Sequence, residues 1–111
     1  MIPAEEQLQA LANGLPAFYR LIEKYSGSIQ PDFREFATVD QADLAHYLRR
    51  YPALAAMHVL VESDALALHD FPVLLKEGHG WLVCWIDHGT KRNITFYSDL
   101  PEAAANFMAY W

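Results

Sequence analysis

The chain has 111 residues, of which 53% are hydrophobic and 20% charged, and its formal net charge is -6. That length is typical of one domain, so we expect residues 1–111 to form a single domain with one core. The negative charge excludes nucleic acid as a favoured partner, because phosphates repel carboxylates, and it favours a basic protein instead.

The longest apolar run covers residues 81–86. A helix that crosses a bilayer needs roughly 20 apolar residues, and the N-terminus lacks the basic and apolar blocks of an export signal, so no membrane contact is expected. Cys84 is the single cysteine. It cannot form an internal disulfide, and its place in an apolar run makes it a small hydrophobe, which fits a reducing cytoplasm.

Two helical segments are predicted near the N-terminus. Apolar residues recur at helical spacing between Pro3 and Leu15, and a second apolar series runs from Phe18 to Tyr25. Pro16 separates the two because it cannot donate a backbone hydrogen bond within the first helix. Residues 29–39 fit neither period and are expected to form a loop with at most one turn of helix.

A clearer helix is predicted from Asp40 to Tyr51. Asp40 can accept a hydrogen bond as the N-cap, with Asp43 in the first turn, and Val39 can pack onto Leu44. Pro52 ends this helix.

The middle of the chain contains candidate strands. Residues 57–62 are rich in β-branched side chains and favour a strand, although residues 53–56 leave a helical continuation open. Residues 65–68 and 72–76 are further candidates, with Pro72 expected at a strand start or an edge.

The last third of the chain predicts a hairpin and a helix. Residues 81–87 are apolar on both alternating sides, which is typical of a central strand covered on both faces, and residues 92–97 alternate apolar and polar side chains beyond a turn at Gly89. Asp99 and Glu102 have the spacing of a capping box before a final helix. The element order predicts an α+β fold: a small antiparallel meander of three to four strands packed with N-terminal helices and a C-terminal helix.

Catalytic and metal sites find little support in the residue pattern. Zinc ligands usually occur in closely spaced pairs, but even the nearest histidines, His79 and His88, are nine positions apart. Glu62, Asp64 and Asp70 could form an acid and base pair, but no nucleophile or glycine-rich phosphate loop accompanies them. We therefore expect no enzyme activity, metal or cofactor.

Most aromatic residues follow the period of their predicted helix or strand, which indicates the core. Phe71, Tyr97 and Tyr110 break or flank these patterns and are the candidates for exposure.

The C-terminal third resembles bacterial immunity proteins of polymorphic toxin systems. The resemblance rests on an aromatic strand, the basic pair Lys91-Arg92, a strand that ends in Thr95-Phe96-Tyr97, then Ser98-Asp99-Leu100 and an aromatic helix that ends in Tyr110-Trp111. It implies a cytoplasmic protein that neutralises a cognate toxin by binding it in a fixed ratio.

Charge indicates where such a toxin would bind. Residues 57–79 contain four carboxylates against Lys76 alone, so a basic toxin would be attracted to this segment and to the turn near residue 88. The predicted contact residues, with Phe71 as the hydrophobic anchor, are Glu62, Asp64, Asp70, Phe71, Glu77 and Asp87.

Two other classes of function stay open. A small scaffold or regulatory subunit could use the aromatic surface to form a homodimer. A small-molecule hydrolase or metal-binding enzyme is the less favoured reading.

Overall fold

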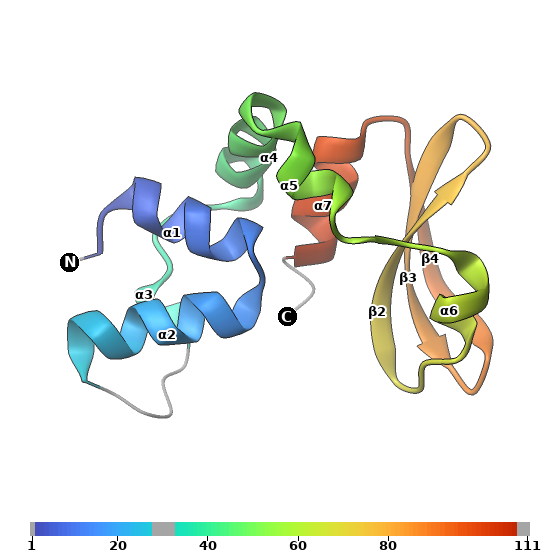
Figure 1. The fold of residues 1–111 in the computed structure, drawn as a ribbon, viewed down its shortest axis with the longest axis horizontal. Helices are drawn as coiled ribbons and strands as arrows, with labels where there is room; N and C mark the ends of the chain where they lie inside the picture. The colour runs from blue at the N-terminus through green and yellow to red at the C-terminus, as the bar shows by residue number, and fades with distance from the viewer. Residues whose placement is uncertain (1, 28–32, 109–111) are drawn as a thin grey trace.

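The computed structural model describes residues 2–27 and 33–108, which form an α+β fold (Figure 1). The helices are α1 (Ala4–Ala12), α2 (Leu15–Ser26), α3 (Phe33–Phe36), α4 (Gln41–Arg50), α5 (Pro52–Ala56), α6 (Glu62–Leu66) and α7 (Leu100–Met108). The strands are β1 (Val59–Leu60), β2 (Phe71–Glu77), β3 (Gly80–Asp87) and β4 (Thr90–Tyr97). The predicted fold class is confirmed.

The four strands form one sheet in the order β1-β2-β3-β4. β2, β3 and β4 are the predicted antiparallel meander, whereas β1 pairs with β2 in parallel, so the sheet is mixed. Both hairpin loops have two residues, and each begins with a positive φ, at Gly78 (57°) and at His88 (50°). Such turns match the right-handed twist of the strands that they join.

The segment from residue 52 to residue 68 differs most from the sequence prediction. The expected strand at residues 57–62 is reduced to the two residues of β1, because the turn that ends α5 covers residues 57–58 and α6 begins at Glu62. The expected strand at residues 65–68 is wrong, since Glu62–Leu66 forms α6. Alanine and leucine are good helix formers, and a short apolar run does not distinguish a strand from a buried helix.

The N-terminal helices follow the prediction closely. α1 ends at Ala12, and α2 begins at Leu15 with Pro16 in its first turn, where a missing N–H costs nothing. α2 ends at Gly27, whose φ of 74° is the left-handed conformation common after a helix. The predicted loop at residues 29–39 contains the one turn of α3, and its residues 29–32 lie outside the described part of the chain.

The capping of α4 is also confirmed. The Asp43 N–H donates to Asp40 Oδ1 (2.8 Å), and the Asp40 N–H donates to Asp43 Oδ2 (3.0 Å). These two bonds satisfy backbone donors that a helix start leaves unpaired.

A buried glutamine fixes the approach to α4. The Gln7 Nε2 group donates to the Ile2 carbonyl (2.8 Å) and to Thr38 Oγ1 (2.8 Å), while the Thr38 N–H donates to Gln7 Oε1 (2.9 Å). Gln7 has no exposed surface, so these bonds offset the cost of burying its amide. They join α1 to the segment before α4.

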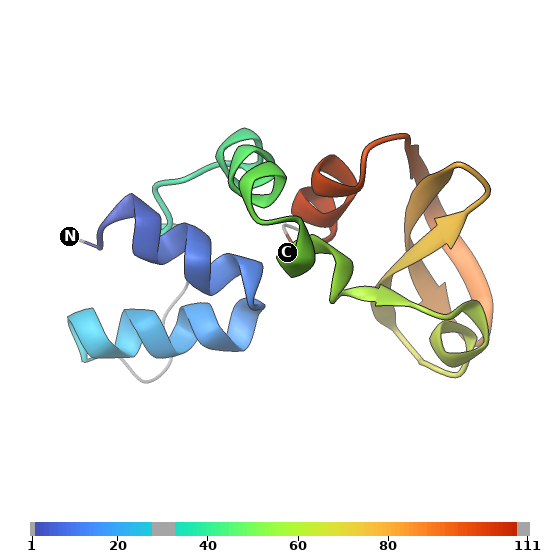
Figure 2. The same ribbon diagram turned by 45° about the horizontal axis from the view of Figure 1, so that its top comes forward.

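The two faces of the sheet are covered by different helices (Figures 1 and 2). On one face Leu74 and Val83 belong to a large core that includes Ala103, Ala104 and the buried side chains of α1, α2 and α4. On the opposite face a smaller core packs under α6, with Ala65 at its centre. Its other buried members are Val73, Leu75, Leu82, Cys84 and Ile86. β3 is therefore covered on both faces, as predicted.

Candidate functional site

An apolar row crosses the whole sheet on the side of α6, which we call the α6 face. Leu60 on β1 is opposite Leu75 on β2, Leu75 is opposite Leu82 on β3, and Leu82 is opposite Phe96 on β4. Residues directly opposite one another point to the same face of a sheet. The two central leucines are buried, but Leu60 at one end is partly exposed and Phe96 at the other end is 56% exposed.

The Phe96 ring lies against Gly80. A Cβ added at Gly80 would be 2.7 Å from Phe96 Cε2 and 2.6 Å from the Tyr97 carbonyl oxygen, so the ring occupies the space that any other side chain would need. An aromatic ring over a strand glycine supports the sheet where that glycine has no side chain to pack. Phe96 is therefore held in place although more than half of it faces solvent.

Ile94 extends the exposed apolar surface along β4. The β3–β4 register shifts between Val83 and Trp85, and Asn93 has a φ of 54°, so β4 contains a β-bulge opposite Cys84. Thr95 pairs with Val83 and so points away from the α6 face. Successive side chains of a strand point to opposite faces, so Ile94 lies on the α6 face. Ile94 is 55% exposed.

Carboxylates surround this apolar surface. Glu77 is the cross-strand partner of Gly80, so it lies beside the Phe96 ring, and Glu62 and Asp64 belong to α6. The Lys91 Nζ group donates to Glu62 Oε1 at 2.7 Å. This hydrogen bond, with a further contribution from the charge of Glu77, raises the pKa of Lys91 above its ordinary value. Lys91 is therefore neutralised by Glu62, and the face keeps a negative surplus.

The other predicted contact residues lie elsewhere. Asp70 and Phe71 are at the start of β2, and Asp87 is at the end of β3, next to the hairpin turn. Glu77 is six residues along β2 from Phe71, or about 20 Å at the rise of an extended strand. Glu77 therefore lies at one end of the sheet and Asp70, Phe71 and Asp87 at the other. Glu62 on α6 is bonded to Lys91, which pairs with Ile86 in the row of Phe71.

The charge of Asp87 is already engaged at its own end of the sheet. Its Oδ2 forms an ion pair with Arg92 Nε at 2.9 Å, and its Oδ1 is 3.6 Å from His88 Nε2. Phe71 is 51% exposed, as predicted, whereas Tyr97 is half-buried. Tyr110 lies outside the described part of the chain.

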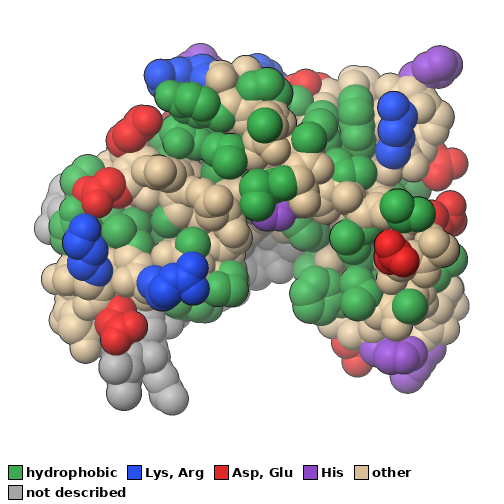
Figure 3. Space-filling view, viewed as in Figure 1, with side chains coloured by type: hydrophobic (Ala, Val, Ile, Leu, Met, Phe, Trp, Pro, Cys, Tyr) green, Lys and Arg blue, Asp and Glu red, His purple; other side chains and the backbone are tan. Residues whose placement is uncertain are grey.

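The structure brings together two histidines that are far apart in the sequence. The ring centroids of His69 and His88 are 5.7 Å apart, at the tip where the end of α6 approaches the hairpin turn. Both are exposed, as are His46 and His79, and histidines are seen at the lower right tip in Figure 3. Within residues 2–27 and 33–108, no three His, Cys, Asp or Glu side chains are grouped so as to hold a metal ion.

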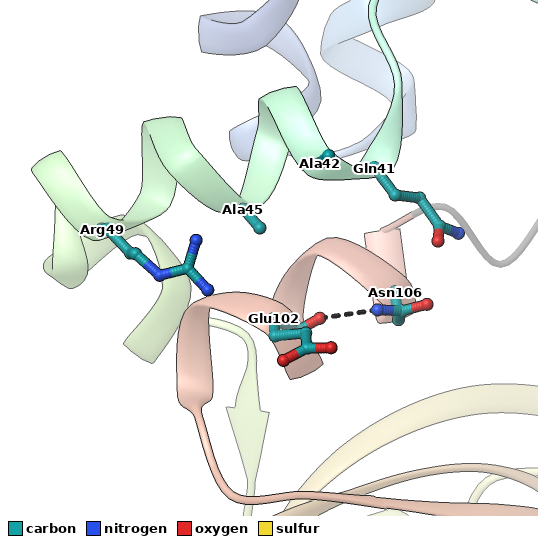
Figure 4. A pocket seen from close by; sticks show the side chains of 6 residues that line it. All are labelled: Gln41, Ala42, Ala45, Arg49, Glu102 and Asn106. Atoms are coloured by element: carbon teal, nitrogen blue, oxygen red, sulfur yellow. Dashed lines mark hydrogen bonds between the residues drawn. The ribbon is translucent and has the colours of Figure 1, made fainter.

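A shallow polar groove lies between α4 and α7 (Figure 4). It has a volume of about 350 Å³ and is lined by Gln41, Ala42, Ala45, Arg49, Glu102 and Asn106. The Arg49 Nη2 group donates to Asp99 Oδ2 at 2.8 Å, and the Asn106 side chain donates to the Glu102 carbonyl at 2.9 Å. The first bond joins α4 to the residue before α7, and the second lies within α7.

An apolar hollow of about 400 Å³ separates the start of α2 from the start of β2. Its lining includes Leu15, His58, Pro72 and Phe107. The His58 Nε2–H group donates to the Ala12 carbonyl (2.8 Å), so its imidazole joins the turn after α5 to the end of α1. Figure 3 shows the molecule hollowed between the N-terminal helices and the sheet.

Cys84 lies under α6 with no exposed surface. Burial raises the pKa of its thiol, although the charge of Lys91 opposes this shift. A buried thiol with a raised pKa is a poor nucleophile, which agrees with its predicted packing role.

Sequence reasoning did not select the exposed apolar residues Leu60, Ile94 and Phe96 as candidates. The signal that could have found them is the pair of apolar positions at Ile94 and Phe96 on the last strand, which has β3 as its strand neighbour and forms one edge of the sheet. An edge strand with exposed apolar side chains can pair with another chain.

Comparisons of the chain with protein-family models, with curated proteins and with solved structures found no match. In the described part of the chain, no helix combines the length and the apolar character that a bilayer crossing needs.

Proposed function

We propose that this protein is an immunity protein that binds a basic toxin in a fixed ratio and thereby neutralises it in the cytoplasm of the cell that makes both. The supporting observation is the α6 face, where exposed apolar side chains lie among carboxylates. Apolar anchors with a charged rim are typical of protein interfaces.

The proposed mechanism has two steps. The surplus negative charge of the chain attracts the basic toxin and raises the association rate, an effect that salt weakens. Burial of exposed apolar side chains then slows dissociation, because a few well-packed anchors provide most of the binding free energy. The bound protein covers or distorts the toxin's active site.

Co-expression with the toxin encoded next to this gene tests the proposal. Cells that make both proteins should survive, and cells that make the toxin alone should die. Reversal of Glu62, Asp64 and Asp70 to Lys should slow association, most strongly at low salt. Equal association rates for the triple variant and the unaltered protein at low salt would exclude these three carboxylates from the contact surface.

Self-association is the second candidate, and the position of β4 favours it. β4 is an edge strand, and a second copy could pair with it to continue the sheet. This alternative predicts a dimer whose population rises with concentration in the absence of a toxin, measured by analytical ultracentrifugation. A monomer at all concentrations would exclude it.

A further inference from the structure

We infer that Phe96, with Ile94 beside it, is the anchor of the α6 face, and that its partner is a basic protein segment in which apolar side chains are flanked by lysine or arginine. This inference deepens the proposed function and rests on it for the partner's identity as a toxin.

Phe96 has the properties of an anchor before any partner arrives. Its backbone is fixed by pairing with Leu82, and its ring lies on the space left by Gly80. An aromatic side chain that is already ordered loses little conformational entropy on binding. Its 56% exposure leaves apolar surface that a partner can bury.

The charges around Phe96 define the partner. Glu77 lies beside the ring and Asp64 lies on the helix that covers the same face, while the lysine of this face, Lys91, is paired with Glu62. An acidic segment, a nucleic acid or an anionic membrane would be repelled there. A second copy would bring the same carboxylates against each other, which is also unfavourable. A cationic segment with apolar side chains complements both features.

Phe71 provides a matched comparison. It is the same residue type, it belongs to the same sheet, and its exposure of 51% is close to that of Phe96. It lies at the opposite end of β2 from Glu77 and borders the apolar hollow. The nearby Asp87 is already paired with Arg92. Phe71 has a neighbouring carboxylate of its own in Asp70, so the two rings differ in their support: the Phe96 ring lies on Gly80, whereas Phe71 borders the hollow.

The test uses a short synthetic peptide of alternating leucine and lysine, and a second peptide with glutamate in place of lysine. Backbone amide shifts of the ¹⁵N-labelled protein report where each peptide binds. We expect the leucine and lysine peptide to shift resonances of β4, α6 and the Gly78 turn, and Phe96→Ala to weaken its binding about tenfold or more. Phe71→Ala should change the dissociation constant by less than about twofold.

Three results would overturn the inference. They are equal weakening by Phe71→Ala and Phe96→Ala, equal binding of the two peptides, or no binding of the lysine peptide. Shifts of β4 that depend on protein concentration without peptide would likewise identify a second copy as the occupant. Ile94→Ala is a second, smaller truncation on the same face that should weaken binding in the same direction, and urea titration of each variant shows that it is folded.

The failure of this inference and that of the proposed function are distinguishable. If the peptide binds as expected but no toxin encoded nearby is neutralised, the anchor and its partner chemistry stand and the immunity function fails. If the protein neutralises the toxin and Phe96→Ala leaves both protection and toxin affinity unchanged, the function stands and the anchor fails.

Discussion

The two faces of the sheet use the same strands but have different covers. α7 has nine residues and α6 has five, which at 1.5 Å per residue correspond to lengths of about 13 and 7 Å. α7 lies between the sheet and α4, and Ala103, Ala104 and Ala105 are all buried in that position. α6 covers the middle of its face and leaves Leu60, Ile94 and Phe96 with exposed surface.

This difference teaches that apolar alternation does not by itself assign a residue to the core. Leu74 and Phe96 both occupy apolar positions of paired strands, but Leu74 has no exposed surface and Phe96 is more than half exposed. The face under α7 belongs to the larger core, whereas the α6 face combines a smaller core with exposed apolar residues, which we propose to bind a partner.

The largest effect is expected for Leu74→Ala. Removal of a fully buried leucine from the large core should lower the free energy of unfolding by about 2–5 kcal/mol, because it loses apolar contacts and leaves a cavity. Urea denaturation followed by circular dichroism measures the change. A loss below about 1 kcal/mol would show that the α7 face is not the stabilising one.

Gly80→Ala should cost about 1–3 kcal/mol of unfolding free energy, because the new methyl group would overlap both the Phe96 ring and the Tyr97 carbonyl oxygen. The carbonyl belongs to the backbone, so the cost should persist in the Gly80→Ala, Phe96→Ala double variant. Gly78→Ala measures a different cost, that of a positive φ with open space around the added Cβ, because Gly80 has no positive φ. A loss below about 0.5 kcal/mol for Gly80→Ala would mean that the contacts around Gly80 are unimportant.

Phe96→Ala alone should lower the free energy of unfolding by less than about 1 kcal/mol, since the side chain is largely exposed. The same urea titration measures this loss. A loss as large as that of Leu74→Ala would show that Phe96 is part of the smaller core and not an exposed binding residue.

The smallest effect is expected for Glu62→Gln, which removes the partner of Lys91. The ion pair is partly exposed, so its removal should cost about 0.2–1 kcal/mol near neutral pH. Because Glu62 raises the pKa of Lys91, the stabilisation is complete below the ordinary lysine value of 10.5 and is lost as the pH rises through the higher folded-state pKa. Unfolding measured from neutral to strongly alkaline pH should show the two proteins converge at the alkaline end. A difference in unfolding free energy that stays constant to the alkaline end would contradict the upward shift of the Lys91 pKa.

Strong local signals explain which elements could be predicted. Asp40 and Asp43 provide both halves of a capping box, and residues 81–87 are apolar on both sides, so each segment had one favoured structure. Residues 57–68 had no such signal, because short runs of alanine, leucine and valine suit either a helix or a strand. Contacts with the rest of the fold chose helix for Glu62–Leu66.

The candidate site was predictable only in part, since its residues meet across strands. Glu62, Asp64 and Glu77 were selected from the charge of their segment, and all three adjoin the α6 face. The proximity of Glu77 to Phe96 depends on the pairing of Glu77 with Gly80 and of Leu82 with Phe96. Register between strands is a tertiary property that local composition does not determine.

The amino-acid sequence by itself determined the acidic charge, the capping of α4, the order of the main elements and the alternation that gives each strand two sides. Only the tertiary structure decided which apolar positions of each side are buried. The physical reason is that alternation places apolar side chains on a face, but their burial depends on the length and position of the helix that covers that face. Leu74 and Val83 are buried on the side of α7, and α6 leaves Phe96 exposed on the other.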